Sequence, residues 1–113
     1  MVQELIINRI FNERHTSDII MYLYLFGPKH RTEIYDAISR NPRMPIKLDL
    51  LESYGVIKTY EEGQRQMLVS LTSKGTKLAA GISNLEKILG GNVEAFRWGF
   101  VMSQLEDFDK AAA

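Results

Sequence analysis

Nine lysines and arginines lie between residues 27 and 77 of this chain, against six acidic residues in the same stretch. The stretch therefore carries a net charge of +3, although the chain as a whole is neutral and both its ends are slightly acidic. Guanidinium and ammonium groups bind phosphates and the acceptor atoms on base edges. A small basic excess confined to one segment predicts a protein that recognises a nucleic-acid sequence rather than one that coats DNA.

Arg43, Ile46 and Lys47 are the residues that we expect to contact bases. A helix is predicted to begin with Pro45 at its first position, where a proline removes no N–H group that the helix needs. The three side chains fall on the face opposite the apolar residues of this helix and close to its leading end. The alternative is a solvated basic face. Asp49 and Glu52 follow closely, so the positive strip is short and belongs to the leading end of the helix.

Three further basic residues are candidates for phosphate contacts. Lys29 and Arg31 precede a predicted helix whose first backbone N–H groups would attract an anion. Lys58, near the following ribbon of strands, is given the same role. The alternative for Lys29 and Arg31 is a charged loop that contributes only solubility.

Other kinds of site find little support in the sequence. His15 and His30 are the only histidines, there is no cysteine, and no His-x-x-x-His spacing occurs, so a metal site and thiol chemistry are not expected. A serine–histidine–aspartate context, a glycine-rich phosphate loop and an isolated carboxylate pair are also missing from the sequence. We therefore expect no enzyme activity and no cofactor.

The elements that must position the basic residues are clearest between Leu48 and Gly75, where the chain runs LDLLESYGVIKTYEEGQRQMLVSLTSKG. A leucine-bearing helix stops at Gly55, and Val56–Ile57 begins a strand. A charged turn leads to a second strand of alternating apolar residues, and Thr72 then caps another helix. Helix, two-stranded ribbon and helix in this order form the second half of a winged helix-turn-helix.

This segment resembles the winged-helix transcriptional regulators of the MarR, PadR and ArsR-like group, over roughly residues 16–80. The shared features are Leu48 and Leu51, Gly55-Val56-Ile57, a charged wing from Glu61 to Arg65, and Leu71-Thr72-Ser73-Lys74-Gly75. The resemblance implies an α+β, mostly helical fold and double-stranded DNA as the partner, with the recognition helix in the major groove. It also implies that Arg65, at the wing tip, enters the minor groove. Pairing of Arg65 with the neighbouring acidic residues is an equal alternative.

The other predicted elements surround this core. In the recognition helix, Met44, Leu48 and Leu51 recur at i, i+4 and i+7 and form the predicted core face. Further helices are predicted over residues 2–11, over 18–26 with Thr16 or Ser17 as cap, and over 33–39 with Thr32 as cap. We expect one domain made of an N-terminal extension (1–14), a winged-helix core (16–80) and a dimerisation helix (92–110), with 111–113 interpreted as a cloning scar.

The predicted last helix, residues 93–108, is apolar over about 240° of its circumference, taking about 100° per residue. One stripe of such a helix can cover the core of its own chain, and the rest requires another partner. Aromatic residues and methionine are enriched at protein interfaces. We therefore expect a homodimer built on Phe96, Trp98, Phe100, Met102 and Leu105, with the alternative that Trp98 lines an effector pocket at the dimer seam.

Together these patterns predict a homodimeric, sequence-specific DNA-binding transcriptional regulator that acts on an inverted-repeat operator. No apolar run approaches the ~20 residues of a membrane helix, so we expect no membrane partner and a cytoplasmic location, and the charged N-terminus argues against a signal peptide. A small-molecule effector is left open. The alternative function is a winged-helix adaptor within a larger assembly, which zero net charge and an apolar last helix also fit.

Overall fold

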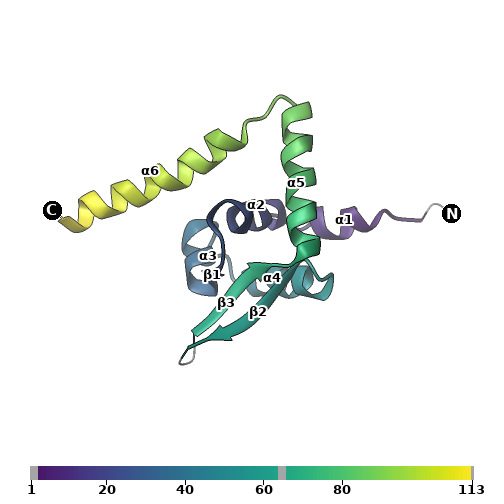
Figure 1. Ribbon diagram of the computed structural model, residues 1–113, viewed down its shortest axis with the longest axis horizontal. Coiled ribbons are helices and arrows are strands. Elements are labelled where there is room, and N and C mark those ends of the chain that lie inside the picture. Colours follow the sequence, from purple (N-terminus) through teal and green to yellow (C-terminus); the bar gives the residue numbers. More distant parts are fainter. Residues whose placement is uncertain (1–2, 64–65, 113) are drawn as a thin grey trace.

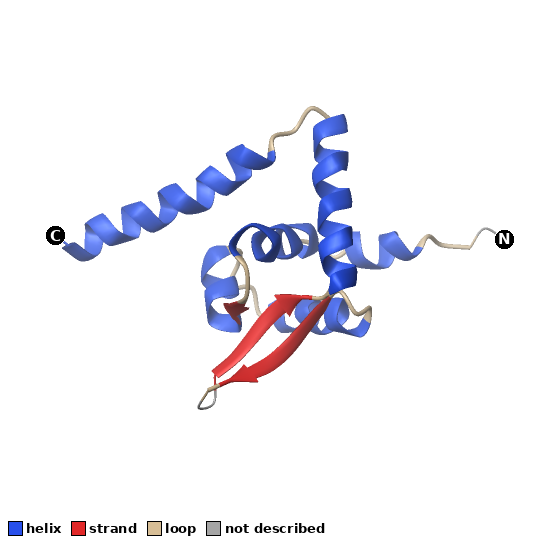
Figure 2. Ribbon diagram, viewed as in Figure 1, coloured by secondary structure: helices blue, strands red, loops and turns tan. Residues whose placement is uncertain are grey.

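The computed structural model describes residues 3–63 and 66–112, with side chains described as far as Glu106. Within these residues, a small antiparallel sheet lies at one edge of the helices (Figures 1 and 2). The elements are α1 Ile6–Phe11, α2 Thr16–Phe26, β1 Lys29–His30, α3 Arg31–Ala37, α4 Met44–Ser53, β2 Ile57–Glu62, β3 Gln66–Leu71, α5 Ser73–Ile88 and α6 Val93–Ala112. This confirms the predicted α+β, mostly helical winged helix-turn-helix with extra helices at both ends.

The core forms around α2, whose Ile19 and Ile20 are fully buried. This helix contacts α4, α5 and β3, so it joins the helix-turn-helix to the wing and to the long helix that follows. Met44, Leu48 and Leu51 of α4 lie in the same apolar cluster, as their spacing predicted. Because this face of α4 is fixed by burial, the opposite face must point to solvent.

The sheet has the strand order β1-β3-β2, with antiparallel pairing throughout. The wing is formed by β2 and β3, which pair from Ile57 opposite Leu71 to Glu62 opposite Gln66. Figure 1 shows it extending from the base of α5 away from the helices. The short strand β1 was not predicted, because two residues are too few to show an alternating pattern. Its pairing with Leu68 and Val69 places the start of α3 beside the wing.

The junction between the wing and α5 is built on Thr72 and Gly75. The hydroxyl of Thr72 accepts a hydrogen bond from the N–H of Gly75 over 3.0 Å, which confirms Thr72 as the cap, and it donates to the carbonyl oxygen of Gly55. A Cβ on Gly75 would overlap the carbonyl oxygen of Val56. These two residues therefore hold α5 against the segment of chain that leaves α4.

The predicted caps of two other helices were wrong. The N-cap of α3 is His30 rather than Thr32, and the His30 N–H donates to the Glu33 carboxylate over 3.0 Å. Thr16 lies inside the first turn of α2, buried, with its hydroxyl donating to the carbonyl oxygen of Ile10 over 2.8 Å. Its tertiary contact with α1 takes the place of the local capping contact that the sequence suggested. At the other end of the chain, α6 starts at Val93 as expected but continues beyond its predicted end, to Ala112.

Candidate nucleic-acid interface

The outer face of α4 begins with Arg43 and Ile46. Arg43 is the N-cap of the helix, and its backbone N–H donates to the side-chain oxygen of Asn41 over 2.8 Å, which orders the turn between α3 and α4. The Arg43 side chain is exposed, and Ile46, one turn further along, is 52% exposed. Both residues therefore lie where the sequence predicted them, at the leading end of α4 and on its solvent face.

Lys47 was predicted on this same face, and that placement was wrong. The residue is only 4% exposed, and its ammonium group donates a hydrogen bond to the carbonyl oxygen of Arg14 over 2.7 Å. Taking about 100° per residue, Lys47 lies only about 40° around α4 from the buried Leu51. Its long stem can therefore lie against the core while the charged end reaches the loop between α1 and α2. In this position Lys47 is a structural residue and not a base contact.

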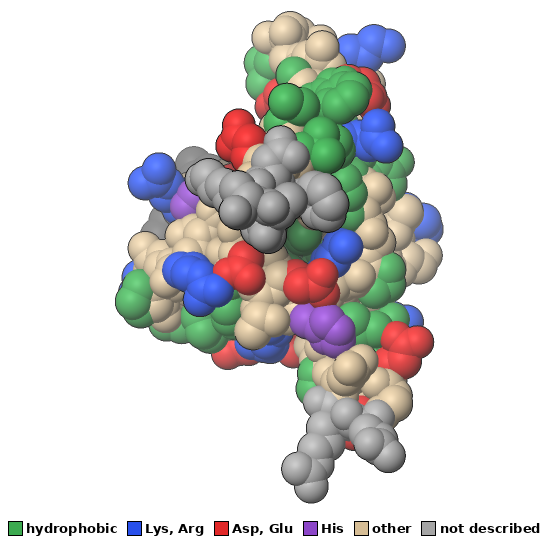
Figure 3. All heavy atoms as spheres, turned by 90° about the vertical axis from the view of Figure 1, so that its left-hand side faces the viewer, with side chains coloured by type: hydrophobic (Ala, Val, Ile, Leu, Met, Phe, Trp, Pro, Cys, Tyr) green, Lys and Arg blue, Asp and Glu red, His purple; other side chains and the backbone are tan. Residues whose placement is uncertain are grey.

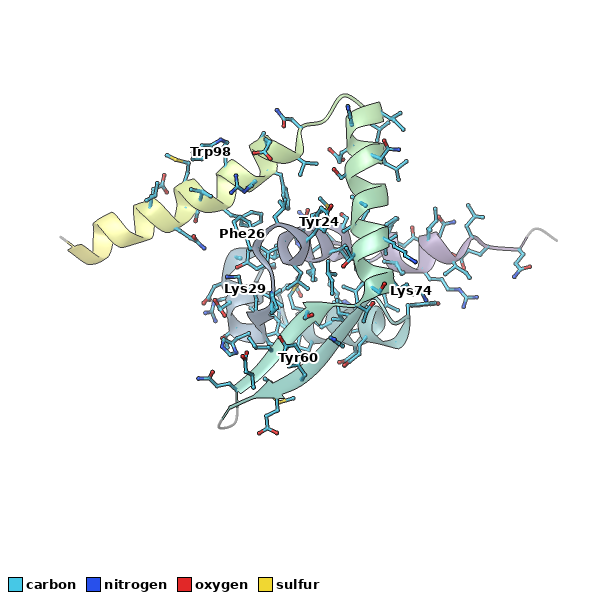
Figure 4. All side chains as sticks on the ribbon, in the orientation of Figure 1. Tyr24, Phe26, Lys29, Tyr60, Lys74 and Trp98 are labelled. Atoms are coloured by element: carbon cyan, nitrogen blue, oxygen red, sulfur yellow. The ribbon has the colours of Figure 1, made fainter. Side chains whose placement is uncertain are left out.

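Lys29 lies in β1 and Arg31 is the first residue of α3, and each is paired with an acidic residue. The guanidinium of Arg31 lies 3.6 Å from the carboxylate of Asp49, so this pair joins α3 to α4 across the helix-turn-helix. The ammonium of Lys29 lies 4.0 Å from the carboxylate of Glu33. Figure 4 shows Lys29 beside α3.

The wing carries Lys58 on β2, directly opposite Ser70 of β3. Lys58 is exposed, and its ammonium lies 5.9 Å from the centre of the Tyr60 ring, whose position on the wing is visible in Figure 4. Arg65, the residue predicted to enter the minor groove, lies outside the described residues.

Sequence reasoning missed Glu13 at this surface, and it noted Asp49 without its pairing with Arg31. Glu13, in the loop between α1 and α2, lies 3.7 Å from the guanidinium of Arg43. Thirty positions separate these two residues in the sequence, so no local spacing could reveal the pair. Figure 3 shows basic and acidic side chains interspersed over the face it displays rather than one continuous basic patch. Exposed ion pairs of this kind contribute little stability, so a phosphate or a base can replace the carboxylate at small cost.

The five predicted dimer residues fall on two different faces of α6. Phe96 and Phe100 turn inward, and the Phe100 ring lies 5.1 Å from the Tyr22 ring and 5.8 Å from the Phe26 ring, centre to centre. Figure 4 shows Phe26 between α2 and α6 and Trp98 on the far side of α6. The outward side chains are about half exposed: Trp98 57%, Met102 49% and Leu105 51%.

The outward residues form a narrow apolar strip. Taking about 100° per residue, Trp98, Met102 and Leu105 lie within about 60° of one another and roughly opposite Phe96. We call these three residues the outer strip of α6. The wide apolar arc seen in the sequence thus divides into a face that covers the core of its own chain and a face exposed to solvent.

Two other kinds of feature can be judged within residues 3–63 and 66–112. None of the helices there has the length and apolar character needed to cross a membrane. In the same part of the chain, no three histidine, aspartate or glutamate side chains come together as a potential metal site.

Known proteins were compared with this chain by sequence and by structure. No known family model and no curated protein sequence matches it. A structure described as a MarR-family transcriptional regulator from Porphyromonas gingivalis is similar, with 21% identity and a TM-score of 0.61 over 81% of this chain and 98% of that one. NadR in complex with 4-hydroxyphenylacetate is 22% identical, with a TM-score of 0.62 over 88% of this chain and 77% of NadR. AbfR bound to DNA is 22% identical, with a TM-score of 0.53 over 93% of this chain and 76% of AbfR. These similarities show that the chain has the same winged-helix fold.

Proposed function

We propose that this protein is a homodimeric transcriptional regulator that binds a specific DNA sequence, with α4 in the major groove and the wing beside the minor groove. The observation that carries the proposal is the exposure of Arg43 and Ile46 at the leading end of α4. In a helix-turn-helix, the N-terminal residues of the second helix contact the bases. Here those residues face solvent, because Met44, Leu48 and Leu51 hold the other face in the core.

The contact residues divide into two groups by chemistry. Arg43 would donate to acceptor atoms on base edges, and Ile46 would contact an apolar group such as a thymine methyl. Lys29, Arg31 and Lys58 would bind phosphates, which fix the position of the protein on the duplex without selecting its sequence. Arg65 keeps its predicted minor-groove role, which the described residues do not test.

Two of the similar structures support this function. One is described as a transcriptional regulator of the MarR family, and AbfR was solved bound to DNA. The outer strip of α6 supports the dimer, because three neighbouring, half-exposed large apolar side chains suit a subunit contact. Two α4 helices related by a two-fold axis would meet an inverted repeat.

The test begins with selection of bound sequences from random DNA. Fluorescence anisotropy then compares the selected duplex with a scrambled one, at low salt because the protein is neutral overall. Arg43→Ala should weaken binding to the selected duplex by about 1–3 kcal/mol per half-site and leave the scrambled duplex nearly unaffected. Lys58→Ala, the matched control, should weaken both duplexes alike and reduce the slope of log K against log salt by about one.

Equal affinity of the wild type for both duplexes, with no response to Arg43→Ala, would falsify sequence-specific binding through α4. That result would favour the alternative function, an adaptor that binds other proteins. The pairing of Arg31 and Arg43 with carboxylates, which makes the outer face of α4 nearly neutral, would then serve a protein contact.

A further inference from the structure

A pocket of about 610 Å³ lies between α6 and the helices α2 and α3. Aromatic side chains from two of these helices line it, namely Tyr22 of α2 and Phe96 and Phe100 of α6. Glu33 and Asp36 of α3 supply carboxylates on another side. A volume of this size is typical of pockets that bind small molecules. The outer strip of α6 faces away from the pocket, so a dimer formed through that strip would leave the pocket open.

Tyr22 gives the pocket an aromatic ring and a hydroxyl group. The residue is only 3% exposed overall. Burial raises the pKa of Tyr22, and the negative charges of Glu33 and Asp36 raise it further, so the hydroxyl keeps its proton at neutral pH. Because Tyr22 lines the pocket, a molecule bound there could form a hydrogen bond with its hydroxyl.

The charges around the pocket are all of one sign. None of the described residues that line it is basic, whereas Glu33 and Asp36 are both acidic. Each carboxylate does have a basic neighbour outside the lining: Lys29, at 4.0 Å from Glu33, and Arg40, paired with Asp36. The Arg40 side chain is 74% exposed, so solvent screens that pair. The side chains that line the pocket therefore present only negative charge to a bound molecule.

We propose that this pocket binds an organic cation with an aromatic body. The aromatic body would pack against Phe96 and Phe100, and the positive group would lie between the carboxylates of Glu33 and Asp36. The Tyr22 ring would add a cation–π contact, and its hydroxyl would bond to a polar group of the ligand. This charge preference is opposite to that of the ligand seen in NadR, since 4-hydroxyphenylacetate carries a carboxylate.

The experiment compares two small molecules that share a phenol ring and differ in charge. Tyramine ends in an ammonium group, and 4-hydroxyphenylacetate ends in a carboxylate. Each is titrated into the ¹⁵N-labelled full-length protein, and the amide signals of Ala95, Gly99 and Ser103, which line the α6 side of the pocket, are followed by NMR. Tyramine should shift these signals and bind about tenfold more tightly than 4-hydroxyphenylacetate. The measurement uses no DNA, so its outcome does not depend on the proposed function.

Three substitutions assign the binding to the pocket. Asp36→Asn and Glu33→Gln remove charge with little change of shape, and the glutamine at position 33 can still accept the capping hydrogen bond from His30. Each should weaken tyramine several-fold, and the double variant should lose the preference for the cation. Tyr22→Phe keeps the buried ring and should weaken tyramine without unfolding the protein. Glu61→Gln removes an exposed carboxylate from the wing and should leave binding unchanged.

The proposal is overturned by any of three results. The first is tighter or equal binding of 4-hydroxyphenylacetate. The second is tyramine binding that is insensitive to the substitutions at positions 33 and 36. The third is the absence of shifts at Ala95, Gly99 and Ser103 with either compound up to millimolar concentration.

Discussion

Gly75 shows how closely one residue can determine the geometry of the wing. It lies in the first turn of α5, against the backbone of Val56, where there is no room for a side chain. The N–H of Gly75 also donates the hydrogen bond that the Thr72 hydroxyl accepts. The residue therefore makes the capping hydrogen bond of α5 while its lack of a side chain lets the backbone of Val56 approach. The sequence indicated Gly75 as part of a motif, and the structure supplies the physical reason for it.

Gly75→Ala should therefore destabilise the protein, although alanine normally favours a helix. Forcing a methyl group into a filled space costs about 1–3 kcal/mol, which exceeds the gain in helix propensity. Urea unfolding followed by circular dichroism measures this difference.

Gly81 provides the matched control for this substitution. It lies in the same helix, and nothing comes within 4 Å of a Cβ built on it. Gly81→Ala should leave stability unchanged or raise it by up to about 1 kcal/mol. If both alanine variants gain stability, the packing of α5 against Val56 is not as described.

At the scale of elements, α4 is held at its leading half by the loop between α1 and α2. Lys47 donates to the carbonyl oxygen of Arg14, and Glu13 pairs with Arg43. The loop itself is fixed by Thr16, whose hydroxyl lies 2.8 Å from the carbonyl oxygen of Ile10 and 3.0 Å from that of Glu13, so its single hydrogen is shared between the two. The orientation of α4 thus depends on a segment outside the helix-turn-helix.

The sequence predicted the elements far better than the contacts between them. The core spacing in α4 and the existence of the strand β3 were predicted from local patterns, and both were confirmed. The alternation in β3 was confirmed only in part, because Val69 is fully buried whereas Met67 is 48% exposed. The strand β1 and the pairing of Glu13 with Arg43 depend on residues distant in the sequence, so no local pattern contained them. Lys47 was misplaced for the same reason, because a lysine near the edge of an apolar face is buried only when a distant carbonyl group accepts its bond.

Lys47→Met should lower the free energy of unfolding, because Lys47 has a structural role. The substitution keeps a long apolar stem but leaves the carbonyl oxygen of Arg14 without its partner, which costs about 1–3 kcal/mol. Lys58→Met changes the same residue type at an exposed position and should stay within about 0.5 kcal/mol of the wild type. Chemical denaturation of the two variants separates them. Equal, small losses in both would contradict the burial of Lys47.

At the scale of the whole molecule, groups of neighbouring apolar side chains are exposed on α1, α5 and α6. Leu5 to Ile7 at the start of α1, Ile88 and Leu89 at the end of α5, and the outer strip of α6 are all exposed. The molecule is elongated, with extents of 60 × 39 × 26 Å, and Figure 1 shows α6 leading away from α5 toward the C-terminus. Single exposed apolar residues are common on any surface, but a strip of large ones on one helix face suits a subunit contact.

The two faces of α6 should respond differently to substitution if the outer strip forms the dimer. Trp98→Ala should raise the dimer dissociation constant by about thirtyfold or more, because a tryptophan at the centre of an interface typically contributes about 2 kcal/mol. Phe100→Ala removes a ring that packs on Tyr22 and Phe26, so it should lower stability by at least about 1 kcal/mol. Sedimentation equilibrium at micromolar concentration measures the first effect, and thermal unfolding at fixed protein concentration measures the second.

A monomeric wild type would refute the dimer and, with it, the inverted-repeat operator. A larger loss of dimer in Phe100→Ala than in Trp98→Ala would instead place the subunit contact on the inner face of α6.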